Sequence, residues 1–132
     1  MTFESRQTMQ TANDFRRIAL ALRDTTEKAH HGHPDFRADG RIFASLHHSM
    51  ERGMVKLTPD QQREFMRAHP HAFTPEAGAW GRQGCTRVLL AHVDAETLGE
   101  ALTTARRNID RPAPRPRARR TRSAATATKR RV

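Results

Sequence analysis

The pattern of apolar and polar residues changes from a strand period to a helix period in the middle of the chain. Residues 41–46 alternate two sets of side chains, which predicts a half-buried strand. Asp39-Gly40, just before this run, predicts a hairpin turn, because tight turns between strands need backbone positions with positive φ. Residues 54–57 repeat the alternation, with Lys56 on the polar side. In the strand predicted over residues 41–46, one face carries Ile42, Ala44 and Leu46, and the other face carries Phe43 and Ser45.

A helix is predicted directly after the second of these strands, over residues 59–68. Thr58 supplies a hydroxyl cap, Pro59 suits the first helical position, and Gln61 completes a capping box. Pro70 ends the helix, because the residue before a proline is disfavoured in the α conformation.

Two further helices follow from apolar residues spaced three and four apart. The first is capped by Thr11 or by Asn13 and extends to about Leu22, and the last is capped by Asp94. The apolar stripes are Phe15, Ile18, Ala19 and Leu22 in the first helix, and Leu98, Ala101, Leu102, Ala105 and Ile109 in the last.

The remaining segments predict further strands. Residues 27–31 and 85–90 fit short strands, and residues 72–84 fit a loop or an irregular edge strand whose Trp80 plugs onto the core. The connections are too short for several parallel crossovers. The sequence therefore predicts an α+β fold: an antiparallel sheet of four to five short strands with three helices.

Charge is distributed very unevenly along the 132 residues. The formal net charge is +10, of which residues 1–110 carry +1 and residues 111–132 carry +9 without a single acid. The second segment is also rich in proline and small residues, so we expect a disordered tail. We thus expect a loose leader over residues 1–10, one α+β domain over residues 11–110, and a basic tail over residues 111–132.

Cysteine content and hydropathy predict a cytoplasmic protein. The lone Cys85 excludes an intramolecular disulfide and suits a reducing compartment. No apolar run approaches the ~20 residues of a membrane helix, and the first residues lack the apolar stretch of a signal peptide.

Most of the predicted domain resembles the MmcQ/YjbR family of small bacterial proteins. The resemblance spans residues 15–109 and is carried by residues 15–46, by GMVKLTPDQQREF at 53–65 and by AWGRQGCTRVLL at 79–90, followed by the closing helix. Arg23 stands where the family usually has proline. The resemblance implies a compact α+β domain likened to a double-wing DNA-binding fold. It brings no catalytic residues.

The tail is the strongest candidate site. Its cations would neutralise phosphates and release counterions, which gives salt-dependent binding without base preference. We therefore predict low-specificity binding of nucleic acid, DNA rather than RNA; the alternative is a solubilising tail or one that binds any polyanion. The tail cations are Arg111, Arg115, Arg117, Arg119, Arg120, Arg122, Lys129, Arg130 and Arg131.

Within the domain, Arg41, Lys56, Arg82 and Arg87 could line one edge or face of the sheet and contact phosphates. The alternative is an ordinary solvated surface, which the near-neutral charge of the domain favours. Trp80 could stack on a base beside Arg82 instead of serving as a plug.

The sequence gives little support for metal binding or for catalysis. The eight histidines show neither a cysteine partner nor helical HxxxH spacing, so we expect no metal site and no cofactor. A nucleophilic Cys85 would need a nearby base, so we expect no enzyme. The competing hypothesis is a protein-interaction or small-ligand module, with Glu27, His30, His33 and Trp80 around a pocket.

Overall fold

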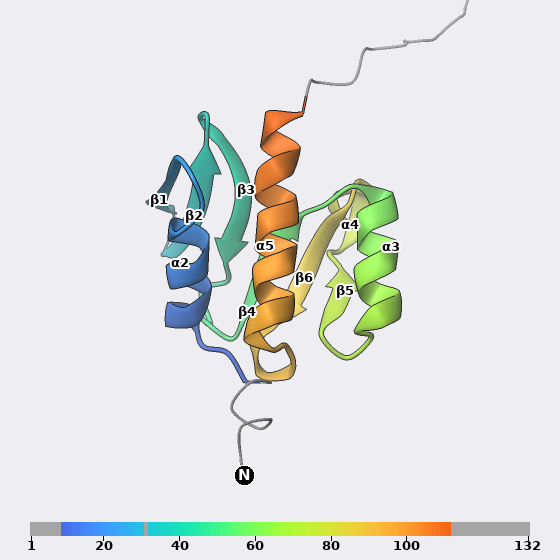
Figure 1. Cartoon of the computed structure of the whole chain (residues 1–132). Helices are drawn as coiled ribbons and strands as arrows, with labels where there is room; N and C mark the ends of the chain where they lie inside the picture. The colour runs from blue at the N-terminus through green and yellow to red at the C-terminus, as the bar shows by residue number, and fades with distance from the viewer. Residues whose placement is uncertain (1–8, 31, 112–132) are drawn as a thin grey trace, which may run out of the picture.

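A six-stranded antiparallel sheet forms the centre of the computed structural model, which describes residues 9–30 and 32–111 (Figure 1). The strand order is β1-β2-β3-β4-β6-β5. The elements in chain order are α2 (Ala12–Leu20), β1 (Thr25–His30), β2 (His33–Ala38), β3 (Arg41–Leu46), β4 (Arg52–Lys56), α3 (Pro59–Ala68), β5 (Phe73–Pro75), α4 (Gly78–Arg82), β6 (Cys85–Leu89), the 3-10 helix η1 (Leu90–His92) and α5 (Ala95–Asp110). The predicted α+β class is confirmed, with one more strand and one more α-helix than expected.

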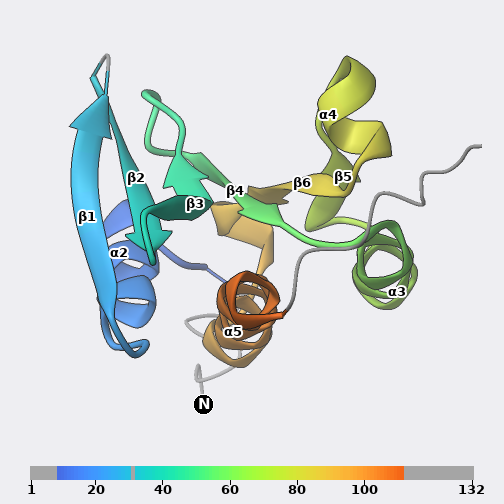
Figure 2. The same cartoon turned by 90° about the horizontal axis from the view of Figure 1, so that it is seen from above.

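The helices are unequally divided between the two faces of the sheet. Helices α2, α3 and α5 lie on one face, and the short α4 rises from the other (Figure 2). The core fills the space between the sheet and the larger helix layer, where Phe15, Phe36, Phe43, Leu98 and Leu102 are fully buried. Within residues 9–30 and 32–111, the opposite face is covered only by α4, at its β5–β6 end.

The predicted helix starts are confirmed. The Thr58 amide donates to Gln61 Oε1 at 2.9 Å, and the Gln61 amide donates to the Thr58 hydroxyl at 3.2 Å. Thr11, not Asn13, caps α2. This helix ends at Leu20, two residues before the predicted Leu22, because the chain turns there into β1 with Asp24 at φ 55°.

The prediction of which side chains of β3 share a face is wrong in the first half of this strand. Phe36 pairs with Ala44, but the next residue of β2, Arg37, pairs with Ile42, so Phe43 is an extra residue in a β-bulge. The bulge places Phe43 in the core beside Ala44, and Ile42 on the opposite face. Simple alternation cannot foresee this change, because a bulge depends on the pairing with the neighbouring strand.

Residues 72–84 form more structure than a loop. They contain β5, an edge strand as predicted, and then α4, which was not predicted. The plug predicted at Trp80 is wrong, since this side chain is 64% exposed. Gly81 and Gly84 make the close contacts instead: a Cβ on either would lie 1.9 Å from the Glu76 or Leu57 carbonyl oxygen, respectively.

Two predictions concern segments with a limited structural description. The predicted leader is described only from residue 9, and the tail that was predicted to be disordered lies, beyond Arg111, outside the described residues. Among the helices of the described chain, none is long and apolar enough to cross a membrane.

Candidate functional site

The face of the sheet that carries α4 is hollowed into a trough of about 550 Å³. Its lining includes His33, Ile42, Met54, Lys56, Trp80 and Cys85. Figure 2 shows the sheet from the end of its strands, with the β1–β2 hairpin at one side and α4 rising at the other. This volume is in the range of ligand sites in proteins.

The strand register explains why these side chains gather. Asp35 pairs with Ser45, Ser45 with Met54, and Met54 with Arg87, so this row lies on one face of the sheet. Lys56 pairs with Cys85 one step further along the same face. Strands far apart in the sequence thus supply one surface.

The trough face is positively charged. Its two carboxylates are both paired, Asp35 with Arg37 at 2.8 Å and Glu76 with Arg87 at 3.2 Å. The hydrogen bond to Asp35 raises the pKa of Arg37, which keeps this guanidinium charged. Three more cations on this face have no ion-pair partner in the described part of the chain: Lys28, Arg52 and Lys56.

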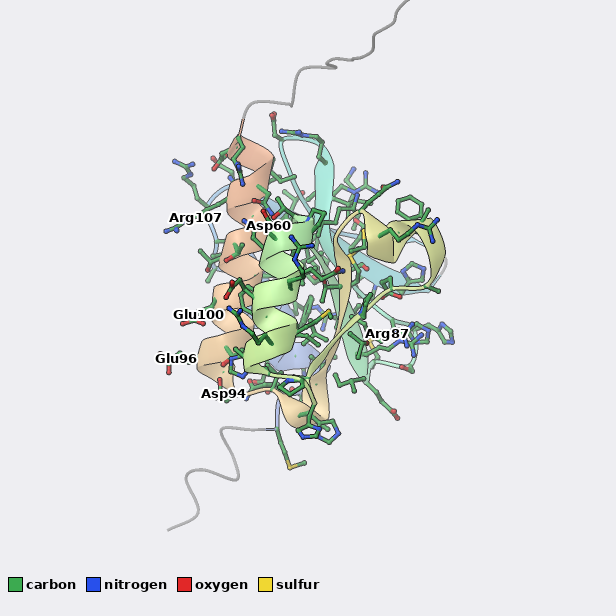
Figure 3. The ribbon with its side chains drawn as sticks, turned by 90° about the vertical axis from the view of Figure 1, so that its right-hand side faces the viewer. Asp60, Arg87, Asp94, Glu96, Glu100 and Arg107 are labelled. Carbon is green, nitrogen blue, oxygen red and sulfur yellow. The ribbon has the colours of Figure 1, made fainter. Side chains whose placement is uncertain are left out.

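The helix layer carries negative charge at the start of α5. Figure 3 shows Asp94, Glu96 and Glu100 along α5, with Arg107 further along the same helix and Arg87 on the far side of the molecule. The near-neutral net charge of residues 1–110 therefore conceals a separation between the two faces. A polyanion would be attracted to the trough and repelled from the first turns of α5.

A second hollow connects the trough to the end of α5. It has a volume of about 250 Å³ and shares Lys56, Trp80 and Cys85 with the trough, while Asn108 and Ile109 form its other side. The Asn108 side chain donates to the Lys56 carbonyl at 3.2 Å and joins the two elements. Because α5 ends at Asp110, the basic tail begins beside this hollow.

Gln62 fixes the position of α4 and was not foreseen as a site residue. Its buried Nε2 lies 3.0 Å from the Gly81 carbonyl and 3.1 Å from both the Cys85 carbonyl and the Thr86 hydroxyl. The sequence did hold a signal, since Gln62 shares the inward face of α3 with Phe65 and Met66. A polar residue on an apolar stripe needs polar partners.

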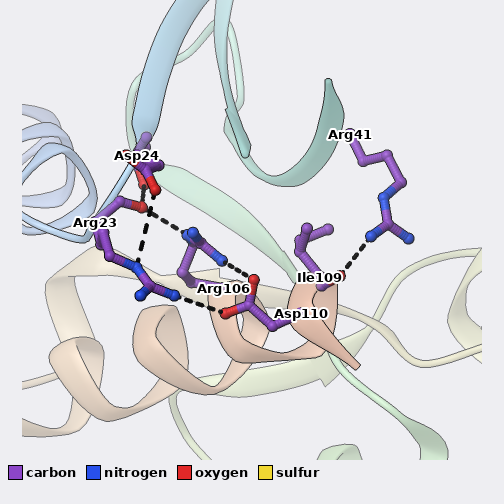
Figure 4. Close-up of polar contacts among 7 residues, drawn as sticks. Arg23, Asp24, Arg41, Arg106, Ile109 and Asp110 are labelled. Carbon is purple, nitrogen blue, oxygen red and sulfur yellow. Dashed lines mark hydrogen bonds and ion pairs between the residues drawn. The ribbon is translucent and has the colours of Figure 1, made fainter. Parts of the chain in front are cut away.

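The structure separates the four domain cations that the sequence grouped. Lys56 and Arg87 share the trough face, and Arg82 is exposed on α4. The Arg41 guanidinium lies on the helix side, where it donates to the Ile109 carbonyl (Figure 4). The single edge or face predicted for all four is therefore wrong.

The same figure shows what surrounds the start of the tail. Arg106 donates to the Arg23 carbonyl at 2.8 Å and to Asp110 at 3.1 Å (Figure 4). These bonds tie the end of α5 to the chain that enters β1. Arg111 is exposed just after them, and the eight other predicted tail cations lie outside the described residues.

The residues of the predicted ligand pocket are only partly brought together. His33 and Trp80 line the trough. Glu27 faces the helix layer and pairs with Arg16 of α2 at 3.0 Å, so its predicted place in the pocket is wrong. The side chain of His30 is not among those that the structure describes.

The titratable groups of the trough do not resemble a reactive centre. Burial raises the pKa of the Cys85 thiol, which disfavours the nucleophilic thiolate. At a neighbouring hollow that also contains His33, Arg52 and Glu76, burial lowers the pKa of His47, with smaller contributions from Arg52 and His48, which favours the neutral ring at pH 7. No three His, Cys, Asp or Glu residues within 9–30 and 32–111 are arranged to hold a metal ion.

Comparison with known proteins shows to which family the chain belongs. The sequence model of the YjbR family matches residues 20–108. The chain belongs to the YjbR family. The YjbR match includes all six strands and α4, so the trough is built entirely from family residues, whereas residues 111–132 lie outside it.

A solved structure shares this YjbR fold. The crystal structure of the Deinococcus radiodurans protein DR2400, with a DUF419 domain, is similar with a TM-score of 0.63 and 27% sequence identity. The similarity covers 75% of this chain and 78% of that one. None of the curated proteins matches this chain.

Proposed function

We propose that the protein is a non-enzymatic, low-specificity nucleic-acid-binding protein, with DNA rather than RNA as its partner. The observation that carries this proposal is the junction between tail and domain: nine cations without an acid begin at the end of α5, beside the hollow that opens into a cationic trough. Both segments carry charges that attract phosphates, and the tail begins where α5 ends, beside the second hollow.

The two surfaces contribute differently to binding. The tail supplies most of the affinity, because each arginine or lysine that neutralises a phosphate releases a counterion. Such contacts carry no sequence information, which explains the low specificity. The trough supplies fewer charges, among which Lys56 is free of carboxylate partners within the described residues. The acids of α5 disfavour binding by the helix face.

A mobility-shift assay with duplex DNA at several salt concentrations tests the role of the tail. The variant is the full chain with the eight cations of residues 112–131 changed to glutamine. We expect it to lose most of its affinity, and the slope of log affinity against log salt to become shallower by up to about 7, since each phosphate contact contributes about 0.9.

The control is a variant that loses two cations from another part of the protein. Arg63→Gln with Arg67→Gln removes two cations from α3, both paired with acids of the same helix, and should leave the affinity nearly unchanged. A tail variant that binds duplex as tightly as the wild type, with the same salt slope, would refute the proposal.

A small-ligand module is the second candidate, and the volume of the trough favours it. Its ligand would bind between His33 and Trp80 without the tail. Such a ligand would change the Trp80 fluorescence equally in the wild type and in the tail variant, and with little dependence on salt. The cytoplasm is the location that we propose for either function, in keeping with the single buried Cys85.

A further inference from the structure

We infer that the trough binds single-stranded DNA, with an unstacked base against Trp80 and a neighbouring phosphate at Lys56. This inference rests on the proposed function and specifies the form of DNA that the domain itself receives. It concerns the trough, whereas the proposed function depends mainly on the tail.

Trp80 is exposed on a firmly held helix, as aromatic rings that stack on bases usually are. It is 64% exposed and is the most exposed of the large apolar side chains in the described chain. Its helix is nevertheless firmly held, because Gly81 packs closely against the Glu76 backbone and Gln62 donates to the Gly81 carbonyl. An exposed aromatic ring on a fixed support can stack on a base with little loss of conformational entropy.

Lys56 supplies the matching charge. It lines both hollows together with Trp80, and no carboxylate pairs with it within the described residues. Arg37 and Arg87 are engaged by Asp35 and Glu76. Lys56 is therefore a cation that lines the same hollows as Trp80 and is available for a phosphate.

The geometry favours a single strand over a duplex. In a duplex both faces of every base are covered by neighbouring bases, so Trp80 has no ring to stack on. An unpaired base exposes its faces, and the apolar floor that includes Ile42 and Met54 gives it a surface to cover. The tail begins beside the second hollow and can hold the following phosphates of the same strand.

Fluorescence provides a direct test, because Trp80 is the only tryptophan and residues 112–132 contain no aromatic residue. The probe is an oligothymidylate of about twelve nucleotides, a length in the range of single-strand binding sites. In the tail-neutralised full chain, we expect this oligonucleotide to quench Trp80 strongly, and an equally long duplex to quench it little. Trp80→Ala has no tryptophan, so its binding is followed by the fluorescence anisotropy of a dye-labelled oligonucleotide, and it should be about tenfold weaker.

Matched variants separate stacking from general effects. Trp80→Phe should retain most of the affinity, because phenylalanine also stacks. Leu20→Ala removes another exposed apolar side chain, from α2, and should change nothing. Lys56→Gln should weaken binding several-fold, whereas Arg107→Gln on α5 should not.

The outcomes distinguish this inference from the proposed function. If Trp80→Ala binds the oligonucleotide like its parent, or if thymidine monophosphate binds as tightly as the strand, the single-strand site is refuted while tail-dependent duplex binding stands. If the tail variant keeps its duplex affinity, the proposed function fails instead, and the single-strand site is refuted only by its own variants.

Discussion

At the scale of single residues, glycines determine how closely the backbone segments around the trough approach one another. Gly84 has φ 112°, and a Cβ there would lie 1.9 Å from the Leu57 carbonyl oxygen. The Leu57 amide in turn donates to the Gly84 carbonyl at 3.2 Å. Gly99 on α5 is the opposite case, because a Cβ there would meet nothing within 4 Å.

These two glycines should respond oppositely to alanine. Gly84→Ala should lower the free energy of unfolding by about 2–4 kcal/mol, since it combines an unfavourable φ with a backbone clash. Gly99→Ala should raise it by up to about 1 kcal/mol through helix propensity. Urea denaturation followed by circular dichroism measures both, and a Gly84→Ala protein as stable as the wild type would contradict the described junction.

The sequence was least informative about the positions of single side chains. Trp80 was placed in the core and lies outside it, and Ile42 was assigned to the wrong face of β3. Hydrophobicity alone cannot decide such cases, because the position of a side chain depends on the contacts of neighbouring backbone segments. The buried residue of α4 is Gly81 instead, which packs against the Glu76 backbone.

At the scale of elements, the helices were predictable because their start signals are local. A cap hydroxyl or carboxylate binds an amide three residues away, so the sequence alone contains both partners. The Thr97 amide donates to Asp94 Oδ1 at 2.7 Å, and this bond lowers the pKa of Asp94. Helix α4 has no side-chain cap of this kind and depends on Gln62 from α3, which explains why it was missed.

The Asp94 cap gives a pH-dependent prediction. Because the folded-state pKa is lowered, the charged cap stabilises fully above its ordinary value of 3.8, and this contribution is lost as the pH falls through the folded-state pKa. Asp94→Ala should lower the free energy of unfolding by about 1 kcal/mol at neutral pH. The difference from the wild type should shrink in acid, below pH 3.8.

Urea denaturation at neutral and acidic pH checks this expectation. Asp94→Asn is the matched control, because asparagine caps helices well without a charge, and its stability should depend less on pH than that of the wild type. A difference between Asp94→Ala and the wild type that stays constant with pH would show that the ionised carboxylate is not the source of the stabilisation.

At the scale of the whole molecule, the arrangement of charge is more important for binding a nucleic acid than the net charge. The trough is cationic, the first turns of α5 are acidic, and the tail begins at the end of α5 beside the second hollow, which connects to the trough. The tail and the trough can therefore hold one strand at two points, and each raises the effective concentration of the strand at the other.

This arrangement predicts a dependence on strand length. An oligothymidylate of about three nucleotides can occupy the trough but not also extend along the tail, so tail neutralisation should hardly change its quenching of Trp80. For a strand of about twenty nucleotides, the same change should weaken binding strongly and reduce the salt slope by up to about 6. Equal loss for both lengths would show that the tail and the trough do not share a strand.

The sequence alone determined the starts of α2, α3 and α5, the antiparallel α+β class and the concentration of positive charge after residue 110, because each depends on neighbouring residues or on composition. Only the tertiary structure decided that β3 contains a bulge, that Trp80 is exposed on a fixed helix, and that Lys56 and Arg87 share a face which Arg41 does not. The physical reason is that these features depend on pairing and packing between segments distant in the chain. The local sequence contains only one partner of each such contact.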